Sequence, residues 1–431
     1  MCDHQEMAKE RYERTPQVLP GQAHGPAVVI ARRASDRLRA GHLWIYRSDV
    51  ESLIPREGNA EIAAGALVTV ADSRGIPLGS GLYSSASQIA VRMVSEEAKL
   101  TREAYLSEVR ERLHTALMLR SEFVPVSSTN DSYRLVFAEA DGLPGIVADR
   151  YNDLVILQLL TQGTAQPDLR EVLAQALSEH FGSAVETLVE RPDPKIRELE
   201  ELETPSAEPL YCAGEAKLAT VFTINGNRFH YDASAGQKTG AFLDQRENYA
   251  AAACHARGAA LDICTYQGGF ALHMARCCDR VTGVDTSRAA LEVADRNLAL
   301  NPGLRAQVDW IEADAFELLR EYEATGQQFD TIVLDPPAFA KSKRAVEGAL
   351  RGYKEMNLRA MKMLRPGGTL VTCSCSHHVG REEFLGVVGA AASDARRRVQ
   401  ILEARGAAPD HPEIVTLPET GYLKCLICRV G

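Results

Sequence analysis

The sequence predicts an α/β protein in which a small β-barrel and a small α+β unit precede a doubly wound parallel sheet. Three observations support this fold class. Short apolar strands alternate with helical segments from residue 259 to residue 375, as in parallel sheets with crossover helices. Closely spaced strand patterns with glycine turns fill residues 27–97. Between these regions, a helical pattern over 101–119 and strand patterns over 133–160 indicate a mixed unit.

The overall composition is that of a globular protein without a membrane-spanning segment. Of 431 residues, 45% are hydrophobic and 25% are charged, and no apolar run reaches the roughly 18 residues of a spanning helix. Residues 1–26 are polar and mixed in charge, so we expect a disordered lead-in rather than a secretory signal. Ten thinly spread cysteines favour free thiols in a reducing cytosol, which predicts a cytoplasmic protein.

The first section, residues 27–97, contains the strongest candidate for a nucleic-acid surface. The net charge of −10 is unlike that of a non-specific nucleic-acid binder, so any such contact must come from a local patch. Residues 31–49 hold five arginines and two aspartates around Trp44 and Tyr46. Basic residues interleaved with aromatic ones are typical of RNA-contacting surfaces. The composition fits a solvated helix followed by a core tryptophan equally well.

The rest of the chain divides at residue 218. Residues 98–218 should contain the helix at 101–119, the strands within 133–160, a second helix at 167–181, and a charged, proline-rich linker at 192–209. Residues 219–431 begin with Asn225-Gly226, a strong hairpin signal. The strands that follow are expected at 259–265, 280–285, 308–314, 329–337 and 368–375.

Polar residues gather where these strands end, at the sheet edge that binds ligands in doubly wound folds. After the first strand, "LDICTYQGGF" (261–270) supplies Asp262, Gly268 and Gly269, and the glycines allow close approach of a ligand to the backbone. Asp285 ends the second strand, where an acid can take both hydroxyls of a ribose, and Asp314 ends the third, within reach of an adenine amino group. For any single aspartate here the alternative is a helix N-cap.

The fourth strand ends in "DPPAF" (335–339), in which two prolines stop the strand and hold a rigid rim beside the ligand. Asp335 therefore lies where the reacting group should be. Neither G-x-G-x-x-G nor a P-loop motif occurs at the first strand, which disfavours a dehydrogenase or a P-loop nucleotidase.

With these motifs in place, residues 259–376 resemble a class I S-adenosylmethionine-dependent methyltransferase. Five further segments are similar to one family of that class, the ribosomal RNA large-subunit methyltransferase I type. They are "ERPDPKIRELE" (190–200), "GQKTGAFLDQRENY" (236–249), "DPPAFAKSK" (335–343), "RGYKEMN" (351–357) and "TCSCS" (372–376). "GHLWIYRSDV" (41–50) and "VTVADSRGIPLGSGLYS" (68–84) resemble the N-terminal PUA domain of that family. The resemblance extends from about residue 27 to the end.

The resemblance implies a cytosine-C5 methyltransferase acting on large-subunit ribosomal RNA. It implies an S-adenosylmethionine site that includes Asp335, and it assigns Cys375 as the nucleophile with Asp335 beside the base. The other cofactor-binding residues that it implies are Asp262, Gly268, Gly269, Asp285 and Asp314. The substrate-binding residues expected with it are Lys238, Asp244, Arg246, Pro336 and Phe339. No membrane or metal is implied, and a homodimer is compatible with the family.

A cysteine suits this chemistry because cytosine C5 is too weak a nucleophile to attack a sulfonium methyl group directly. A thiolate added to C6 makes C5 enamine-like, which divides one difficult step into two easier ones. The thiolate needs nearby positive charge or a helix N-terminus, and His377 and His378 are candidates. Cys373 is expected to be a core thiol. The strand-four motif lacks the second cysteine that another branch of such enzymes uses, so the group that removes the C5 proton stays open.

Three alternatives remain at this point. A zinc site in "VTCSCSHH" (371–378) is disfavoured, because C-x-C is too tight for a zinc knuckle and Cys425 and Cys428 should face opposite sides of a strand. A guanine-nitrogen methyltransferase would use "DPP" without a nucleophilic cysteine. An inactive RNA-binding assembly factor would not need the aspartates and glycines of the cofactor loop. The sequence does not specify the target nucleotide.

Overall fold

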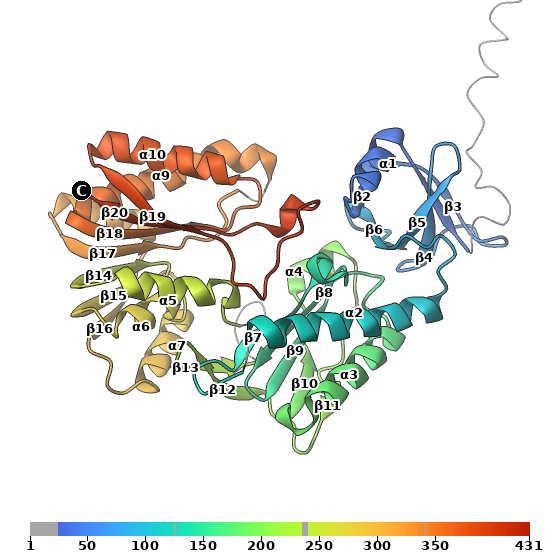
Figure 1. Cartoon of the computed structure of the whole chain (residues 1–431), viewed down its shortest axis with the longest axis horizontal. Coiled ribbons are helices and arrows are strands. Elements are labelled where there is room, and N and C mark those ends of the chain that lie inside the picture. The colour runs from blue at the N-terminus through green and yellow to red at the C-terminus, as the bar shows by residue number, and fades with distance from the viewer. Residues whose placement is uncertain (1–24, 125, 235–239, 341) are drawn as a thin grey trace, which may run out of the picture.

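The computed structural model describes residues 25–124, 126–234, 240–340 and 342–431 (Figure 1). Each of the three predicted sections contains a sheet of its own, although the boundaries at 97/98 and 218/219 stay predictions. Residues 1–24, which make up most of the predicted disordered lead-in, lie outside the described residues. No helix in the described part of the chain has both the length and the apolar character needed to cross a lipid bilayer.

The N-terminal section is a six-stranded sheet with one helix, in the order β2-β6-β5-β4-β1-β3. Its side chains form a separate core that includes Val28, Ile45, Val70 and Val91. Apolar, β-branched residues at these positions suit a strand that is buried on one face. The elements are β1 (Ala27–Ile30), α1 (Arg32–Arg39), β2 (Trp44–Tyr46), β3 (Val50–Ile54), β4 (Leu67–Asp72), β5 (Pro77–Tyr83) and β6 (Ile89–Ser95).

The central section is a five-stranded sheet covered by two helices, in the order β11-β10-β9-β8-β7. The predicted helix is present as α2 (Arg102–Phe123), and the Thr101 side chain accepts a hydrogen bond from the Ala104 amide, as an N-cap should. The other elements are β7 (Ser132–Phe137), β8 (Ile146–Tyr151), β9 (Leu154–Leu159), α3 (Pro167–Phe181), β10 (Thr187–Glu190), α4 (Pro194–Leu199) and β11 (Tyr211–Cys212).

Part of the predicted linker at 192–209 is instead an ordered connection. Arg197 in α4 is buried against Glu190, 2.9 Å away. Glu200 is buried and accepts hydrogen bonds from the Ser84 hydroxyl (2.8 Å) and the Arg92 guanidinium (3.3 Å) of the N-terminal sheet. Charge and proline content suggested a linker, but ion pairs and hydrogen bonds offset the cost of removing these charged side chains from water.

The Asn225-Gly226 hairpin is confirmed between β12 (Ala219–Ile224) and β13 (Asn227–Asp232). Asn225 and Gly226 have φ angles of 49° and 80°, the positive values that this turn requires. Phe222 and Phe229 of the hairpin share one core with Tyr151 and Leu154 of the central sheet. The central and C-terminal sections are therefore packed together through a continuous apolar core.

The C-terminal section is a seven-stranded sheet in the order β16-β15-β14-β17-β18-β20-β19. Figure 1 shows α9 and α10 along one face and α5, α6 and α7 along the other, and each face has its own core. The strands are β14 (Ala259–Ile263), β15 (Arg280–Asp285), β16 (Gln307–Glu312), β17 (Phe329–Leu334), β18 (Leu364–Ser374), β19 (Val399–Arg405) and β20 (Lys424–Val430). The helices are α5 (Arg246–His255), α6 (Gly269–Met274), α7 (Arg288–Ala299), α8 (Ala315–Ala324), α9 (Val346–Met363) and α10 (Arg381–Ala395).

The five strands predicted between residues 259 and 375 pair parallel as expected, and the sheet is extended by two further strands with antiparallel pairing. β20 pairs antiparallel with both β18 and β19. The chain returns from β19 to β20 through residues 406–423 without an α-helix, and a parallel crossover usually needs one. As predicted, Cys425 and Cys428 on β20 belong to the cores on opposite faces of the sheet.

Residues 406–423, which we call the β19–β20 excursion, connect all three sections. In Figure 1 this red segment leaves the sheet and extends toward the blue N-terminal section. Arg120 in α2 donates to the Asp410 carbonyl at 2.8 Å, and His42 lies 3.8 Å from Glu419. The excursion therefore holds the C-terminal sheet against both preceding sections.

Candidate active site

The loop after β14 has a strained backbone held by one buried carboxylate. Cys264 and Tyr266 adopt φ angles of 64° and 53°, which non-glycine residues rarely take, and Gly268 has φ of 86°. Asp262 Oδ2 accepts hydrogen bonds from Thr265 Oγ1 (2.6 Å) and from the Ala271 amide (2.9 Å). Strain retained in this way is common at ligand-binding loops.

Asp262 holds this loop through one carboxylate oxygen, Oδ2, and leaves the other oxygen, Oδ1, without a bond to the loop. Its side chain is fully buried, and Oδ1 has no hydrogen-bond partner among the described residues. Burial raises the pKa of Asp262 to about 7, against the opposing hydrogen bonds from Thr265 and Ala271. An unpartnered buried carboxylate oxygen is costly unless a ligand or water supplies a donor.

The next two strand ends differ from each other. At the end of β15, Asp285 accepts from the Tyr266 amide and from the Ser287 amide, both at 2.9 Å, and so supports the same loop. At the end of β16, Asp314 is exposed and caps α8 through the amides of Phe316 and Glu317. The N-cap interpretation is thus correct for Asp314, and its contact with an adenine stays a prediction.

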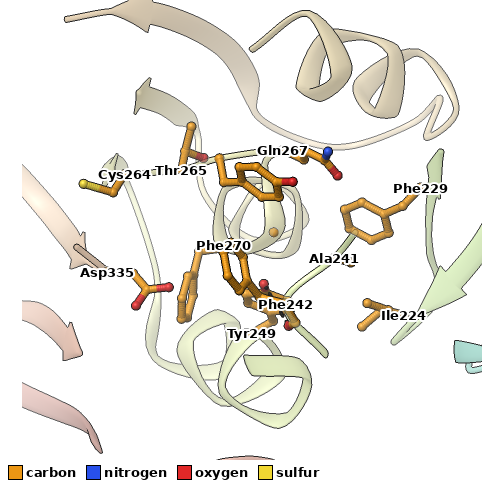
Figure 2. A pocket seen from close by; sticks show the side chains of 12 residues that line it. Ile224, Phe229, Ala241, Phe242, Tyr249, Cys264, Thr265, Gln267, Phe270 and Asp335 are labelled. Atoms are coloured by element: carbon orange, nitrogen blue, oxygen red, sulfur yellow. Dashed lines mark hydrogen bonds between the residues drawn. The ribbon is translucent and has the colours of Figure 1, made fainter. Parts of the chain in front are cut away.

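A pocket opens beside this loop, between the first strand end and the segment before α5 (Figure 2). Cys264 and Asp335 lie on one side of it and Phe229, Ala241 and Ile224 on the other. The remaining lining residues are mostly aromatic or come from the loop: Phe242, Tyr249, Thr265, Tyr266, Gln267, Gly269 and Phe270.

Gly269 is required by the packing of this pocket. A Cβ atom placed on Gly269 would lie 2.5 Å from Tyr249 Cζ, so the backbone here approaches a buried ring too closely for any side chain. Phe242 and Tyr266 meet edge to face, with ring centroids 5.0 Å apart. Neither aromatic residue was predicted, although the positive φ of Tyr266 marks the loop as specialised once the structure is known.

Asp335 projects into the pocket from the end of β17 (Figure 2). Gln245 Nε2 donates a hydrogen bond to its Oδ1 at 3.0 Å. Burial, followed by the nearby carboxylates of Asp244 and Asp262, raises the pKa of Asp335 to about 8. At neutral pH this carboxyl group is therefore mostly protonated and can donate a hydrogen bond.

The two cysteines of "CSC" have different surroundings. Cys373 lies within β18, is fully buried, and pairs across the ladder with Cys425. Burial and its neighbours Cys425 and Asp335 raise the pKa of Cys373 well above its usual value. Cys375 lies just beyond the last residue of β18, is half-buried, and has Sγ 3.8 Å from the Pro336 carbonyl oxygen. The expectation that Cys373 is a core thiol is confirmed.

Tyr422, just before the antiparallel strand β20, and Lys424, its first residue, lie beside Asp244 and the Cys375 loop, and the sequence analysis did not predict either of them. The Tyr422 hydroxyl donates to Asp244 Oδ2 at 2.5 Å. Lys424 Nζ donates to the carbonyl oxygens of Ser376 and Tyr422, both at 2.8 Å. A lysine inside the apolar run "GYLKCLIC" was the available signal, because a lysine in a buried strand is rare without a partner.

The predicted substrate-binding residues are only partly brought together. Asp244 reaches the site through Tyr422, whereas Pro336 is buried and contributes its carbonyl. Phe339 is half-buried and packs on Tyr353, with ring centroids 4.8 Å apart. Lys238 lies outside the described residues.

The expectation that Arg246 contacts the substrate does not agree with the structure. Its guanidinium is buried and forms two hydrogen bonds with Asp410, at 3.0 and 3.3 Å. Arg246 thus fixes the start of α5 to the β19–β20 excursion. The sequence could not show this, because Asp410 lies more than 160 residues away in an irregular segment.

The two histidines after Cys375 are both exposed. His377 Nδ1 donates to the Glu419 carbonyl at 3.1 Å, which ties the cysteine loop to the β19–β20 excursion. Among the described residues, no three His, Cys, Asp or Glu side chains are arranged to hold a metal ion.

Comparison with known proteins places the chain in a family. A profile of PUA-like domains matches residues 28–96, and a profile described as S-adenosylmethionine-dependent methyltransferase matches residues 160–429. Ribosomal RNA large subunit methyltransferase I of Erwinia tasmaniensis is 36% identical over 407 residues, covering 94% of this chain and 99% of the relative. The protein of the same name from Klebsiella pneumoniae is 36% identical over 408 residues, covering 94% and 98%. The chain belongs to the ribosomal RNA large subunit methyltransferase I family.

Solved structures agree on the fold of this methyltransferase family. SMU.776, a methyltransferase complexed with SAH, has a TM-score of 0.77 at 18% identity and covers 94% of this chain and 99% of its own. A SAM-dependent methyltransferase from Streptococcus mutans gives the same TM-score and coverage at 17% identity. The resemblances to a PUA domain and to a class I methyltransferase are thereby confirmed.

The residues present fit S-adenosylmethionine, the methyl donor of this family. The buried oxygen of Asp262, which has no partner among the described residues, is a feature that a bound ligand explains. The pocket beside this loop combines aromatic walls with the carboxyl group of Asp335. The protein is an S-adenosylmethionine-dependent methyltransferase.

Proposed function

We propose that this methyltransferase acts on large-subunit ribosomal RNA and forms 5-methylcytosine through a covalent adduct with Cys375. The observation that carries the proposal is the position of the half-buried Cys375 thiol. It lies against the Pro336 carbonyl, one residue from Asp335, at the sheet edge that also carries the glycine loop. The names of the 36%-identical relatives support the RNA class, and the PUA-like domain supports RNA contact.

The proposed reaction proceeds in three steps. The Cys375 thiolate adds to C6 of the cytosine, which forms an S–C6 bond and turns C5 into a nucleophilic, enamine-like carbon. C5 then attacks the methyl group that S-adenosylmethionine supplies, and S-adenosylhomocysteine leaves. The C5 proton then passes to solvent water and the S–C6 bond breaks, which restores the aromatic base and the thiolate and returns to Asp335 the proton that it donates to N3.

Asp335 is proposed to act on the edge of the base. Its pKa of about 8, raised chiefly by burial, keeps a proton on the carboxyl group at neutral pH. That proton can be donated to N3 of the cytosine, which draws electron density from C6 and favours thiolate attack. Gln245 holds the other carboxyl oxygen and so fixes the orientation of the group.

On the cofactor side, Asp285 is proposed to hold the ribose hydroxyls and Asp314 to meet the adenine amino group. The amide of Gly269 at the start of α6, with Gly268 as the N-cap, is proposed to face the methionine portion of the ligand. Burial of Asp262 beneath the loop gives it a shaping role. A homodimer is also proposed from the family resemblance alone.

The decisive experiment compares Cys375→Ala with Cys373→Ala. Ribosomal RNA from cells that lack the protein is methylated in vitro by each variant, and the modified nucleotides are mapped by mass spectrometry. We expect Cys375→Ala to lose about 10³-fold or more in rate, as removal of a covalent nucleophile should, whereas Cys373→Ala keeps most of the activity.

The same mapping separates the rival functions. Methylguanine as the product, or near-native activity of Cys375→Ala, would show that the cytosine-C5 mechanism is wrong. Absence of any methylated nucleotide with the native protein would favour an RNA-binding assembly factor.

A further inference from the structure

We propose that Lys424 is a positioning residue whose ammonium group stabilises the thiolate of Cys375. The proposal deepens the proposed function, since it depends on Cys375 being the nucleophile. Lys424 would supply a positive charge of the kind that a reactive thiolate needs beside it.

The strand register places Lys424 at the right level. In the β18–β20 ladder Lys424 is the partner of Ser374, the residue just before Cys375. Lys424 Nζ then reaches the Ser376 carbonyl, just after Cys375, at 2.8 Å. The lysine therefore spans the backbone of the cysteine loop and contacts it on both sides of the thiol.

The hydrogen bonds of Lys424 Nζ also leave its positive charge available to stabilise a thiolate. An ammonium group has three N–H bonds, and the carbonyls of Ser376 and Tyr422 take two of them. These neutral acceptors fix the position of Nζ without neutralising its charge. The side chain is almost fully buried, so water screens that charge weakly.

Among the described interactions, Lys424 is a cation that acts on Cys375. Cys375 interacts electrostatically with Tyr353, Tyr422 and Lys424, and both tyrosines have raised pKa values and stay neutral. The other charged or titratable groups that face Lys424 are Arg381, Glu383, Glu413 and His377. Since Arg381 forms an ion pair with Glu413 at 2.9 Å, the opposite charges of these two residues largely cancel in their effect on Lys424.

Burial lowers the pKa of Lys424 to about 8, and the negative charge of Cys375 opposes that decrease. The thiolate and the ammonium group thus support one another. The thiol proton leaves to solvent before the base binds. When the thiolate attacks C6, its charge moves into the base and the ammonium group loses its counterion.

The test measures thiolate formation without methyl transfer. The full-length protein is treated with iodoacetamide between pH 5.5 and 9.5, and alkylation at Cys375 is quantified by peptide mass spectrometry. The exposed Cys254 in the same sample is the internal control. We expect Lys424→Met to slow alkylation of Cys375 at pH 7 by about tenfold and to move its pH midpoint upward. Lys424→Arg, which keeps the charge, should stay within threefold of native.

Correct folding of each variant is verified by S-adenosylmethionine titration. Lys424→Met removes the donor to two buried carbonyl groups, so Lys424→Gln, which keeps a donor, is the second variant if Lys424→Met does not fold. A native alkylation profile in the folded Lys424→Met or Lys424→Gln protein would overturn the proposal. Loss of methylation in Cys375→Ala together with such a profile means that this inference alone fails. A shifted profile together with active Cys375→Ala means that the proposed function fails.

Discussion

The two sides of the candidate active site are built differently. On the cofactor side, residues 262–285, a glycine loop and the carboxylates of Asp262 and Asp285 come from adjacent strands and hold one another through short-range hydrogen bonds. On the thiol side, residues 335–336 and 373–376 are completed by Tyr422 and Lys424 from a strand that joins the sheet late and in the opposite direction. The cofactor side is a local motif, whereas the thiol side is an assembly of distant segments.

This difference implies that the two sides can be disturbed separately. Ligand affinity should depend on the backbone of the loop after β14. Reaction rate should depend on residues that the β19–β20 excursion delivers. The following substitutions are ordered from the largest expected effect to the smallest, and each one tests whether the separation holds.

Gly269→Val should abolish most cofactor binding. The added side chain would overlap Tyr249, whose Cζ lies 2.5 Å from the position of a Cβ atom. Overpacking of this kind costs about 1–3 kcal/mol, which corresponds to a loss of roughly 5- to 150-fold in S-adenosylmethionine affinity by calorimetry. Gly389→Val in α10, where a Cβ atom meets open space, is the matched control. Affinity within threefold of native would contradict the required close approach.

Tyr422→Phe should lower kcat by about tenfold while leaving S-adenosylmethionine affinity within twofold. The lost hydrogen bond to Asp244 involves a carboxylate and is worth about 1.5–3 kcal/mol, part of which the site recovers by relaxation. Steady-state kinetics on ribosomal RNA would show the effect, with Tyr322→Phe in α8 as the control. An equal loss of cofactor affinity would show that the two sides are coupled.

Asp335→Asn should change how stability depends on pH. The pKa of about 8 in the folded protein exceeds that of an unfolded aspartate, because burial and two neighbouring carboxylates disfavour the charge. Between about pH 4 and 8 the folded state therefore holds the extra proton, and stability falls as pH rises, by about 1 kcal/mol per pH unit.

The Asn variant lacks this titration. In the absence of cofactor it should gain stability relative to native as pH increases from 6 to 9, which thermal denaturation would measure. Asp295→Asn, at an exposed helical position, is the control. Parallel pH profiles for native and Asp335→Asn would be inconsistent with a protonated carboxyl group at neutral pH.

Cys373→Ala should have the smallest effect on rate, within about threefold, and should cost about 1 kcal/mol of stability as a small buried truncation. Cys428→Ala, equally buried in the core on the opposite face, should cost a similar amount. A rate loss approaching that of Cys375→Ala would assign chemistry to both cysteines.

Most of the cofactor side could be predicted from the sequence, because its signals are local. Strand, glycine and aspartate recur there at short spacings, and the strand ends fell within a few residues of the predicted ones. Asp314 shows the limit, since the same residue type and position also produce an N-cap. On the thiol side the sequence located Cys375 and Asp335, but it assigned Arg246 to the substrate when a buried partner holds it.

The sequence by itself determined the order of strands and helices, the glycine loop and the one cysteine at the end of the fifth strand, because apolar periodicity and turn residues act over short distances. Only the tertiary structure decided which distant side chains meet there. The antiparallel pairing of β20 places Lys424 beside the cysteine loop. Asp410, in the β19–β20 excursion, forms an ion pair with Arg246. Such contacts depend on how burial and hydrogen bonding are satisfied across the whole fold, and no local pattern in the chain records them.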